Sequence, residues 1–133
     1  MTANLLEVAT RVEGARAEEQ RELLIAAFET FKGPRDSYVP GRIRRWHPQW
    51  FAFEKMLNAE AFESAAMTLV PEGGSFQVSR GMDADRTGFA NISVAGDDPA
   101  VEPKDFHAFA ATPALALTAA ALRALAARAG EAE

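Results

Sequence analysis

One stretch of the chain, "GRIRRWHPQW" at positions 41–50, gathers side chains of the types that bind partners. It holds three arginines and both tryptophans of the chain: Arg42, Arg44, Arg45, Trp46 and Trp50. Arginine beside tryptophan can hold single-stranded nucleic acid by combining charge with base stacking. The same residue types are enriched in protein-binding hot spots. A third interpretation is structural: the tryptophans anchor a long connection on the core while the arginines stay in solvent. The sequence leaves all three interpretations open.

The charge of the chain favours a protein partner over nucleic acid. The formal net charge is −5, which opposes broad affinity for a phosphate backbone. The charge is unevenly spread, because residues 35–55 carry a local net charge of +3 and residues 71–105 carry one of −4. We therefore expect a basic end and an acidic end. We predict that the five residues of the basic and aromatic stretch bind another protein, with nucleic acid as the alternative partner.

Catalytic chemistry finds little support in the residue types. His47 and His107 are the only histidines, and neither belongs to a Glu-x-x-His pattern. No serine lies in a Gly-x-Ser-x-Gly turn. The chain has no cysteine, which excludes disulfides, thiolate metal sites and cysteine nucleophiles. We therefore predict a protein that is not an enzyme and that uses no cofactor.

A short acidic run matches part of a calcium-binding loop. In "DADRTGFANISV", five residues fall at ligand or turn positions of that pattern: Asp83, Asp85, Thr87, Gly88 and Asn91. The position of the bidentate glutamate is occupied by Val94, and the run leads into an expected strand rather than a helix. We favour a β-hairpin turn and predict no metal site, with weak calcium binding over Asp83–Asn91 as the alternative.

Apolar periodicity predicts helices in the first part of the chain. Residues 1–33 form an N-terminal helical segment whose clearest apolar stripe is Leu24, Ala27, Phe28 and Phe31. Residues 34–57 form a basic and aromatic connection. Within it a short helical stretch from Pro48 places three apolar residues on one face: Trp50, Phe53 and Leu57.

Residues 58–130 are expected to form a helix, a β-meander and a terminal helix. Period-two alternation in "SFQVS", in "GFANISV" and over residues 104–110, with Gly-, Asp- and Pro-rich connections, predicts three antiparallel strands. Thr112 caps the terminal helix and Pro113 suits its first position. We predict one domain over residues 1–133, of the α+β class, with a three-stranded antiparallel sheet flanked by helices in an α/β/α sandwich-like arrangement. The helix near residues 59–69 and the terminal helix would cover the sheet.

Two stretches, "ESAAMTLVPEGGSFQVSRG" and "AATPALALTAAALRALAARA", carry a family resemblance. Together they resemble the phage ABA-sandwich group, a family of small bacteriophage and prophage proteins, over roughly residues 59–128. Members often have Trp where Phe76 stands and Cys where Thr118 stands. The resemblance implies a small sheet between helices and a phage or prophage origin. It implies no functional residues, because the family has no established activity.

These observations lead to a functional prediction. We expect a non-enzymatic phage or prophage accessory protein that binds a host or phage protein, for example to inhibit a host defence or nucleic-acid-handling complex. One alternative is weak nucleic-acid binding through the basic and aromatic stretch. Another is a virion or assembly component that forms a homo-oligomer through the alanine-rich terminal helix. The N-terminus lacks a signal-peptide pattern and no apolar run is long enough to cross a bilayer, so we expect no membrane association and a location in the bacterial cytoplasm.

Overall fold

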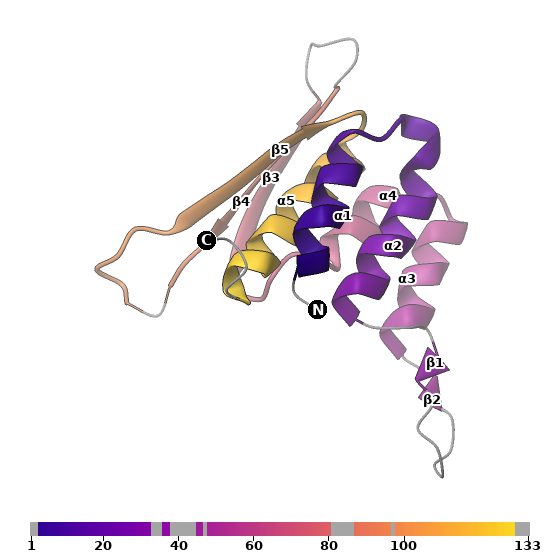
Figure 1. Ribbon diagram of the computed structural model, residues 1–133, viewed down its shortest axis with the longest axis horizontal. Coiled ribbons are helices and arrows are strands. Elements are labelled where there is room, and N and C mark those ends of the chain that lie inside the picture. The colour runs from indigo at the N-terminus through magenta and orange to yellow at the C-terminus, as the bar shows by residue number, and fades with distance from the viewer. Residues whose placement is uncertain are drawn as a thin grey trace.

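The fold combines helices with a small antiparallel sheet (Figure 1). The computed structural model describes residues 3–32, 36–37, 45–46, 48–80, 87–96 and 98–129. The helices are α1 (Ala3–Glu13), a short 3-10 helix (Ala17–Glu19), α2 (Gln20–Lys32), α3 (Pro48–Asn58), α4 (Phe62–Met67) and α5 (Pro113–Arg128). The strands are β1 (Asp36–Ser37), β2 (Arg45–Trp46), β3 (Gly74–Arg80), β4 (Gly88–Val94) and β5 (Lys104–Ala110). The predicted α+β class is confirmed.

The predicted meander is present as a sheet with the strand order β3-β4-β5, in which each strand is antiparallel to its neighbour. The register aligns one row of apolar residues across the sheet: Phe76, Ile92 and Phe106. The next row is polar: Gln77, Asn91 and His107. Because successive side chains of a strand point to opposite faces, the two rows lie on opposite faces of the sheet.

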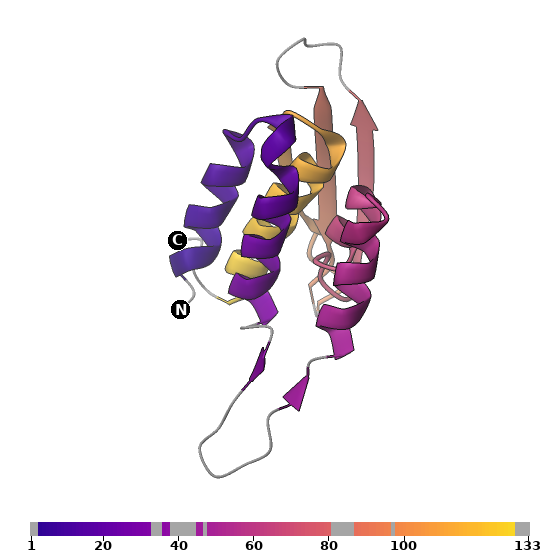
Figure 2. The ribbon, with the colours of Figure 1, turned by 90° about the vertical axis from the view of Figure 1, so that its right-hand side faces the viewer.

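The described helices that pack on the sheet lie on one of its faces (Figures 1 and 2). α5 packs against β4 and β5, and α1, α2 and α4 pack in turn on α5. The covered face is built from small and apolar side chains such as Ala90, Ile92 and Ala108, which are buried. The polar side chains of the opposite face need water or a hydrogen-bonding partner.

The layer order therefore differs from the expected sandwich. α4 packs against α5 and not over the sheet, so the prediction that the helix near residues 59–69 covers the sheet is wrong. Within the described residues the order is sheet, α5 and then the other helices. The physical reason is that one face of the strands carries polar residues, which an apolar helix would leave without hydrogen-bond partners.

α5 is the centre of the core. Its residues 113–122 and 124–126 are buried, and alanine supplies most of them, which allows neighbouring backbones to approach closely. Among the described residues Thr118 has the one buried hydroxyl, which donates to the carbonyl oxygen of Ala114 at 2.8 Å. A helix that is apolar on all sides is expected inside a protein. The prediction that this helix offers a surface for self-association is therefore wrong.

One ion pair joins α1 to α5. Arg123 donates from Nε and Nη2 to the carboxylate of Glu13, with 3.3 Å between Nε and Oε2. Both side chains are partly buried, and two donors on one carboxylate fix the relative orientation of the groups. The contact therefore sets how the C-terminal half of α5 lies against the last turn of α1.

Thr112 fixes the start of α5. Its hydroxyl accepts a hydrogen bond from the Leu115 amide at 3.1 Å and donates to Oε1 of Gln20 at 3.0 Å. We expect Thr112→Ala to lower the free energy of unfolding by about 1 kcal/mol, the usual cost of a lost N-cap, as measured by urea unfolding. Thr112→Ser keeps the hydroxyl and should retain most of that stability. An alanine variant as stable as the wild type would contradict the capping role.

Candidate binding surfaces

Trp50, predicted as a partner contact, lies in the core. It is 2% exposed, and its ring centroid lies 4.7 Å from that of Phe28 and 5.7 Å from that of Phe53, both edge to face. Phe28 and Phe53 stack on each other at 4.1 Å. Trp50 therefore anchors α3 on α2 and is closed to a partner. The binding prediction for this residue is wrong, and the structural interpretation is right.

The other four residues of the predicted patch are described only in part. Arg45 and Trp46 form β2, which pairs antiparallel with Asp36–Ser37 of β1. Figure 1 places this short ladder beyond the ends of α2 and α3, away from the three-stranded sheet. Arg42 and Arg44 lie outside the described residues. A binding role for these four residues stays a prediction.

Two residues of the alternative calcium site are integrated into the sheet and its surroundings. Thr87 donates from Oγ1 to the carbonyl oxygen of Ala111 at 2.6 Å, and Asn91 lies in the middle of β4. Asp83 and Asp85 lie outside the described residues. Across the described part of the chain, no three His, Asp or Glu side chains are grouped so as to hold a metal ion.

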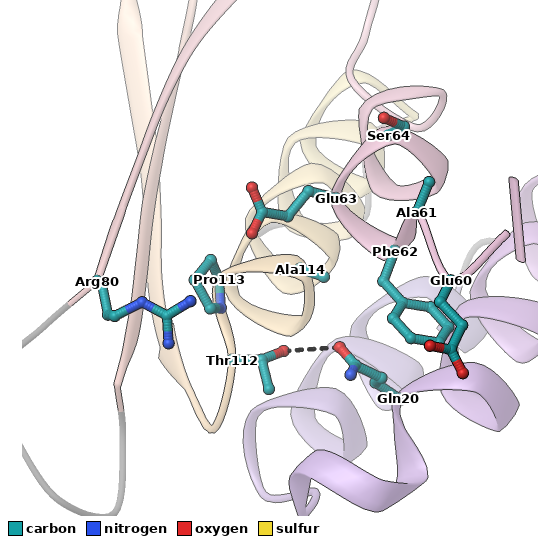
Figure 3. A pocket seen from close by; sticks show the side chains of 10 residues that line it. All are labelled: Gln20, Glu60, Ala61, Phe62, Glu63, Ser64, Arg80, Thr112, Pro113 and Ala114. Carbon is teal, nitrogen blue, oxygen red and sulfur yellow. Dashed lines mark hydrogen bonds between the residues drawn. The ribbon is translucent and has the colours of Figure 1, made fainter.

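A polar pocket of about 320 Å³ opens between β3, α4 and the start of α5 (Figure 3). Its polar lining residues come from separate segments of the chain: Gln20, Glu60, Glu63, Ser64, Arg80 and Thr112. The sequence does not predict this pocket, because no local motif joins its lining residues. Only the packing of α4 and β3 beside α5 brings them together.

Opposite charges face this pocket. Arg80 of β3 and Glu63 of α4 point toward the space between their elements (Figure 3). Neither side chain makes an ion pair or hydrogen bond with another described residue. The described lining contains carboxylates, a guanidinium and hydroxyls but no histidine, so it supplies charge and hydrogen bonds rather than an activated nucleophile. It can hold a small polar group.

The outer face of the sheet, which points away from α5, carries no helix among the described residues (Figure 1). Nine side chains form it: Ser75, Gln77, Ser79, Phe89, Asn91, Ser93, Asp105, His107 and Phe109. All are partly or fully exposed. Seven of the nine are polar, so this face is suited to water, and the two that are not polar require an explanation.

These two residues form an aromatic pair. Phe89 and Phe109 stand directly opposite each other in the ladder between β4 and β5, with ring centroids 4.9 Å apart. The ring of His107 lies 6.4 Å from that of Phe89. Phe109 is 48% exposed, although its neighbours Ala108 and Ala110 on the other face are buried. β5 therefore turns its small residues toward α5 and a large apolar ring outward.

The sequence carries a signal for this aromatic pair. In "KDFHAFA", Phe109 alternates with two alanines, and in "GFANISV", Phe89 alternates with Ala90 and Gly88. Small residues mark a face that another element approaches closely, so the large residues between them must point to the opposite face. The alternation thus predicts the aromatic pair once the alanine-rich helix is placed on the sheet.

Comparison with other proteins supplies no family for the chain. No protein-family model, curated protein or solved structure matches it. None of the helices in the described residues is both long and apolar enough to cross a membrane. Function must therefore be inferred from the surfaces themselves.

Proposed function

We propose that the outer face of the sheet binds another protein, and that the chain is a non-enzymatic accessory protein of phage or prophage origin. The observation that carries the proposal is an aromatic pair beside polar side chains, in which Phe109 is 48% exposed and Phe89 is partly exposed. Aromatic residues bordered by a polar rim are the usual composition of a protein-binding hot spot. A partner that covers the pair removes two apolar rings from water, and the surrounding Ser, Gln and Asn side chains supply hydrogen bonds.

The charge of this face supports a protein partner over nucleic acid. None of its nine described residues is Lys or Arg, and its one carboxylate, that of Asp105, accepts a hydrogen bond from Ser93 at 2.6 Å. Binding to nucleic acid draws much of its affinity from cations that neutralise phosphates. An aromatic sheet face without cations can stack bases but lacks that contribution.

Nucleic-acid binding through the basic and aromatic stretch is the second proposal. The observation that favours it is the concentration of Arg42, Arg44 and Arg45 beside Trp46 in an otherwise acidic chain. Its weakness is that Trp50, buried against Phe28, is not open to stack on a base. The same four residues also suit a second protein contact.

The biological setting rests on the sequence motifs of residues 59–128. Their resemblance to the phage ABA-sandwich group supports a role in phage or prophage biology and a site of action in the bacterial cytoplasm. A formal net charge of −5 suits a protein that blocks the basic surface of a host defence or nucleic-acid-handling complex. We therefore propose such an inhibitor as the most specific form of the function.

We expect Phe109→Thr to weaken capture of the partner by about 30-fold, which corresponds to about 2 kcal/mol, the level that defines a hot spot. Threonine favours strands, and Phe109 is half exposed, so the variant should stay folded. The measurement is affinity capture from host lysate treated with nuclease, followed by titration of the captured protein against purified variants.

Two control variants separate the surfaces. Ser75→Thr lies on the same face, at the other end of the sheet, and should leave capture unchanged. Arg44→Glu changes the basic stretch alone. If Arg44→Glu abolishes capture and Phe109→Thr does not, the partner binds the basic stretch. Capture that disappears with nuclease in every variant would support nucleic-acid binding and contradict the first proposal.

A further inference from the structure

We propose that β3 is a self-pairing edge, through which two copies of the chain join antiparallel about a two-fold axis and form one continuous sheet. This surface is the open side of a strand and is separate from the outer face proposed above. The partner it fits is a second copy of the chain. Three features of the described residues support the inference: an unprotected edge, a self-complementary sequence and an incompletely covered apolar side chain.

The edge is open and lacks the usual protection. β3 is the first strand in the order β3-β4-β5, and no described strand pairs with its free side (Figure 2). Exposed edges commonly carry charges or proline, which discourage pairing with another chain. Residues 74–79 contain neither, and the first charge is Arg80 at the end of the strand. The opposite edge differs, because β5 follows Pro103, begins with Lys104 and Asp105, and is contacted by α1.

The sequence of β3 matches itself when it is reversed. "SFQVS" reads Ser, apolar, Gln, apolar, Ser in both directions around Gln77. With the two-fold axis at Gln77, an antiparallel pair places Ser75 opposite Ser79 of the second copy and Phe76 opposite Val78 of the second copy. Polar residues then meet polar residues on the outer face, and an aromatic residue meets a β-branched one on the inner face. Both are favourable cross-strand pairs, and the interface is isologous, as a two-fold dimer requires.

Phe76 gives the pairing an energetic basis. Its side chain lies in the row of Ile92 and Phe106, on the face that α5 covers. It is nevertheless 40% exposed, whereas Ile92 is buried, because α5 packs mainly over β4 and β5 and only lightly against β3. A second copy brings its Val78 alongside this ring and covers part of it. Burying apolar surface there stabilises the pair.

Charge complements the register at both ends of the paired strands. Arg80 stands opposite Gly74 of the second copy, and Gly74 follows two residues after the acidic Glu72. The cation of one copy thus faces the end of the strand that lies near the single carboxylate of Glu72 in the other, and the two-fold axis repeats this arrangement. No like charges oppose each other along residues 74–80.

The test uses the full chain and exploits its lack of cysteine. Wild-type protein should sediment as a dimer whose fraction rises with concentration. In Gln77→Cys, two thiols face each other at the two-fold axis, so mild oxidation should yield a covalent dimer on a non-reducing gel. His107→Cys is the matched control, because His107 lies in the same cross-strand row at the other edge and should cross-link far less.

A charge variant tests the register independently. Gln77→Lys places two ammonium groups opposite each other and should weaken dimerisation at least tenfold, whereas His107→Lys should not change it. Circular dichroism should show both variants folded, because both positions are exposed. The proposal is overturned if the wild type stays monomeric at every concentration, or if the dimer forms but Gln77→Cys cross-links no faster than His107→Cys. A binding-surface variant such as Phe109→Thr should leave the dimer intact, so failure of one proposal can be distinguished from failure of the other.

Discussion

Gly88→Ala is expected to lower the free energy of unfolding by about 3 kcal/mol or more, at the upper end of the range for overpacked sites. Gly88 begins β4 where this strand meets the start of α5. A Cβ atom at this position would lie 2.1 Å from the carbonyl carbon and oxygen of Thr112 and 2.4 Å from the Pro113 nitrogen. These are backbone atoms that cannot rotate away, so the strand and the helix must move apart.

Thermal unfolding followed by circular dichroism measures this effect. A loss of this size lowers Tm by roughly 10 °C for a chain of this length. Gly96→Ala is the matched control, because nothing lies within 4 Å of a Cβ atom there, and its Tm should stay close to that of the wild type. If Gly88→Ala and Gly96→Ala had the same Tm, β4 and α5 would not be in such close contact.

Trp50→Ala is expected to cost about 3 to 5 kcal/mol of unfolding free energy, the usual penalty for removing a buried aromatic side chain. The substitution removes the ring that packs edge to face on both Phe28 and Phe53. Those two rings keep their stacked contact but lose the neighbour that closes the cluster. The junction between α2 and α3 should therefore loosen before the rest of the core.

Phe51→Ala is the control for this prediction. Phe51 is the next residue of α3 but is 55% exposed, with the Lys55 Nζ 5.5 Å from its ring centroid. Its loss should change stability by about 0.5 kcal/mol or less, as for most surface substitutions. Urea unfolding of both variants gives the comparison. If Trp50→Ala were as stable as the wild type, Trp50 would not be a core residue and would again be a candidate for partner binding.

Much of the fold is predictable because its signals are local. Period-two alternation locates the three strands, and Thr112 followed by Pro113 locates the start of α5 to the residue. Each of these signals depends only on neighbours in sequence. The layer order has no such local signal, because it depends on which face of the sheet is covered by a helix from elsewhere in the sequence.

The candidate site was harder to predict, and Trp50 shows why. Residue type alone grouped it with the arginines as a binding residue. Its helical spacing with Phe53 and Leu57 already indicated a buried stripe, and all three are buried in the structure. Spacing reports on burial, whereas residue type reports only on what a side chain can do if it is exposed. The pocket beside Arg80 left no such signal, since its residues meet only through tertiary packing.

The helix at the centre of the core, α5, is synthesised after the elements that pack on it. α5 is the last described element, yet the sheet, α1, α2 and α4 all pack on it. Glu13 binds Arg123, which lies 110 positions later in the sequence, and Gln20 binds Thr112, which lies 92 positions later. Before α5 emerges from the ribosome, the apolar face of the meander and the inward faces of the earlier helices lack the helix on which they pack. Folding therefore depends on contacts distant in sequence, and the earlier elements keep these apolar surfaces exposed until α5 has been synthesised.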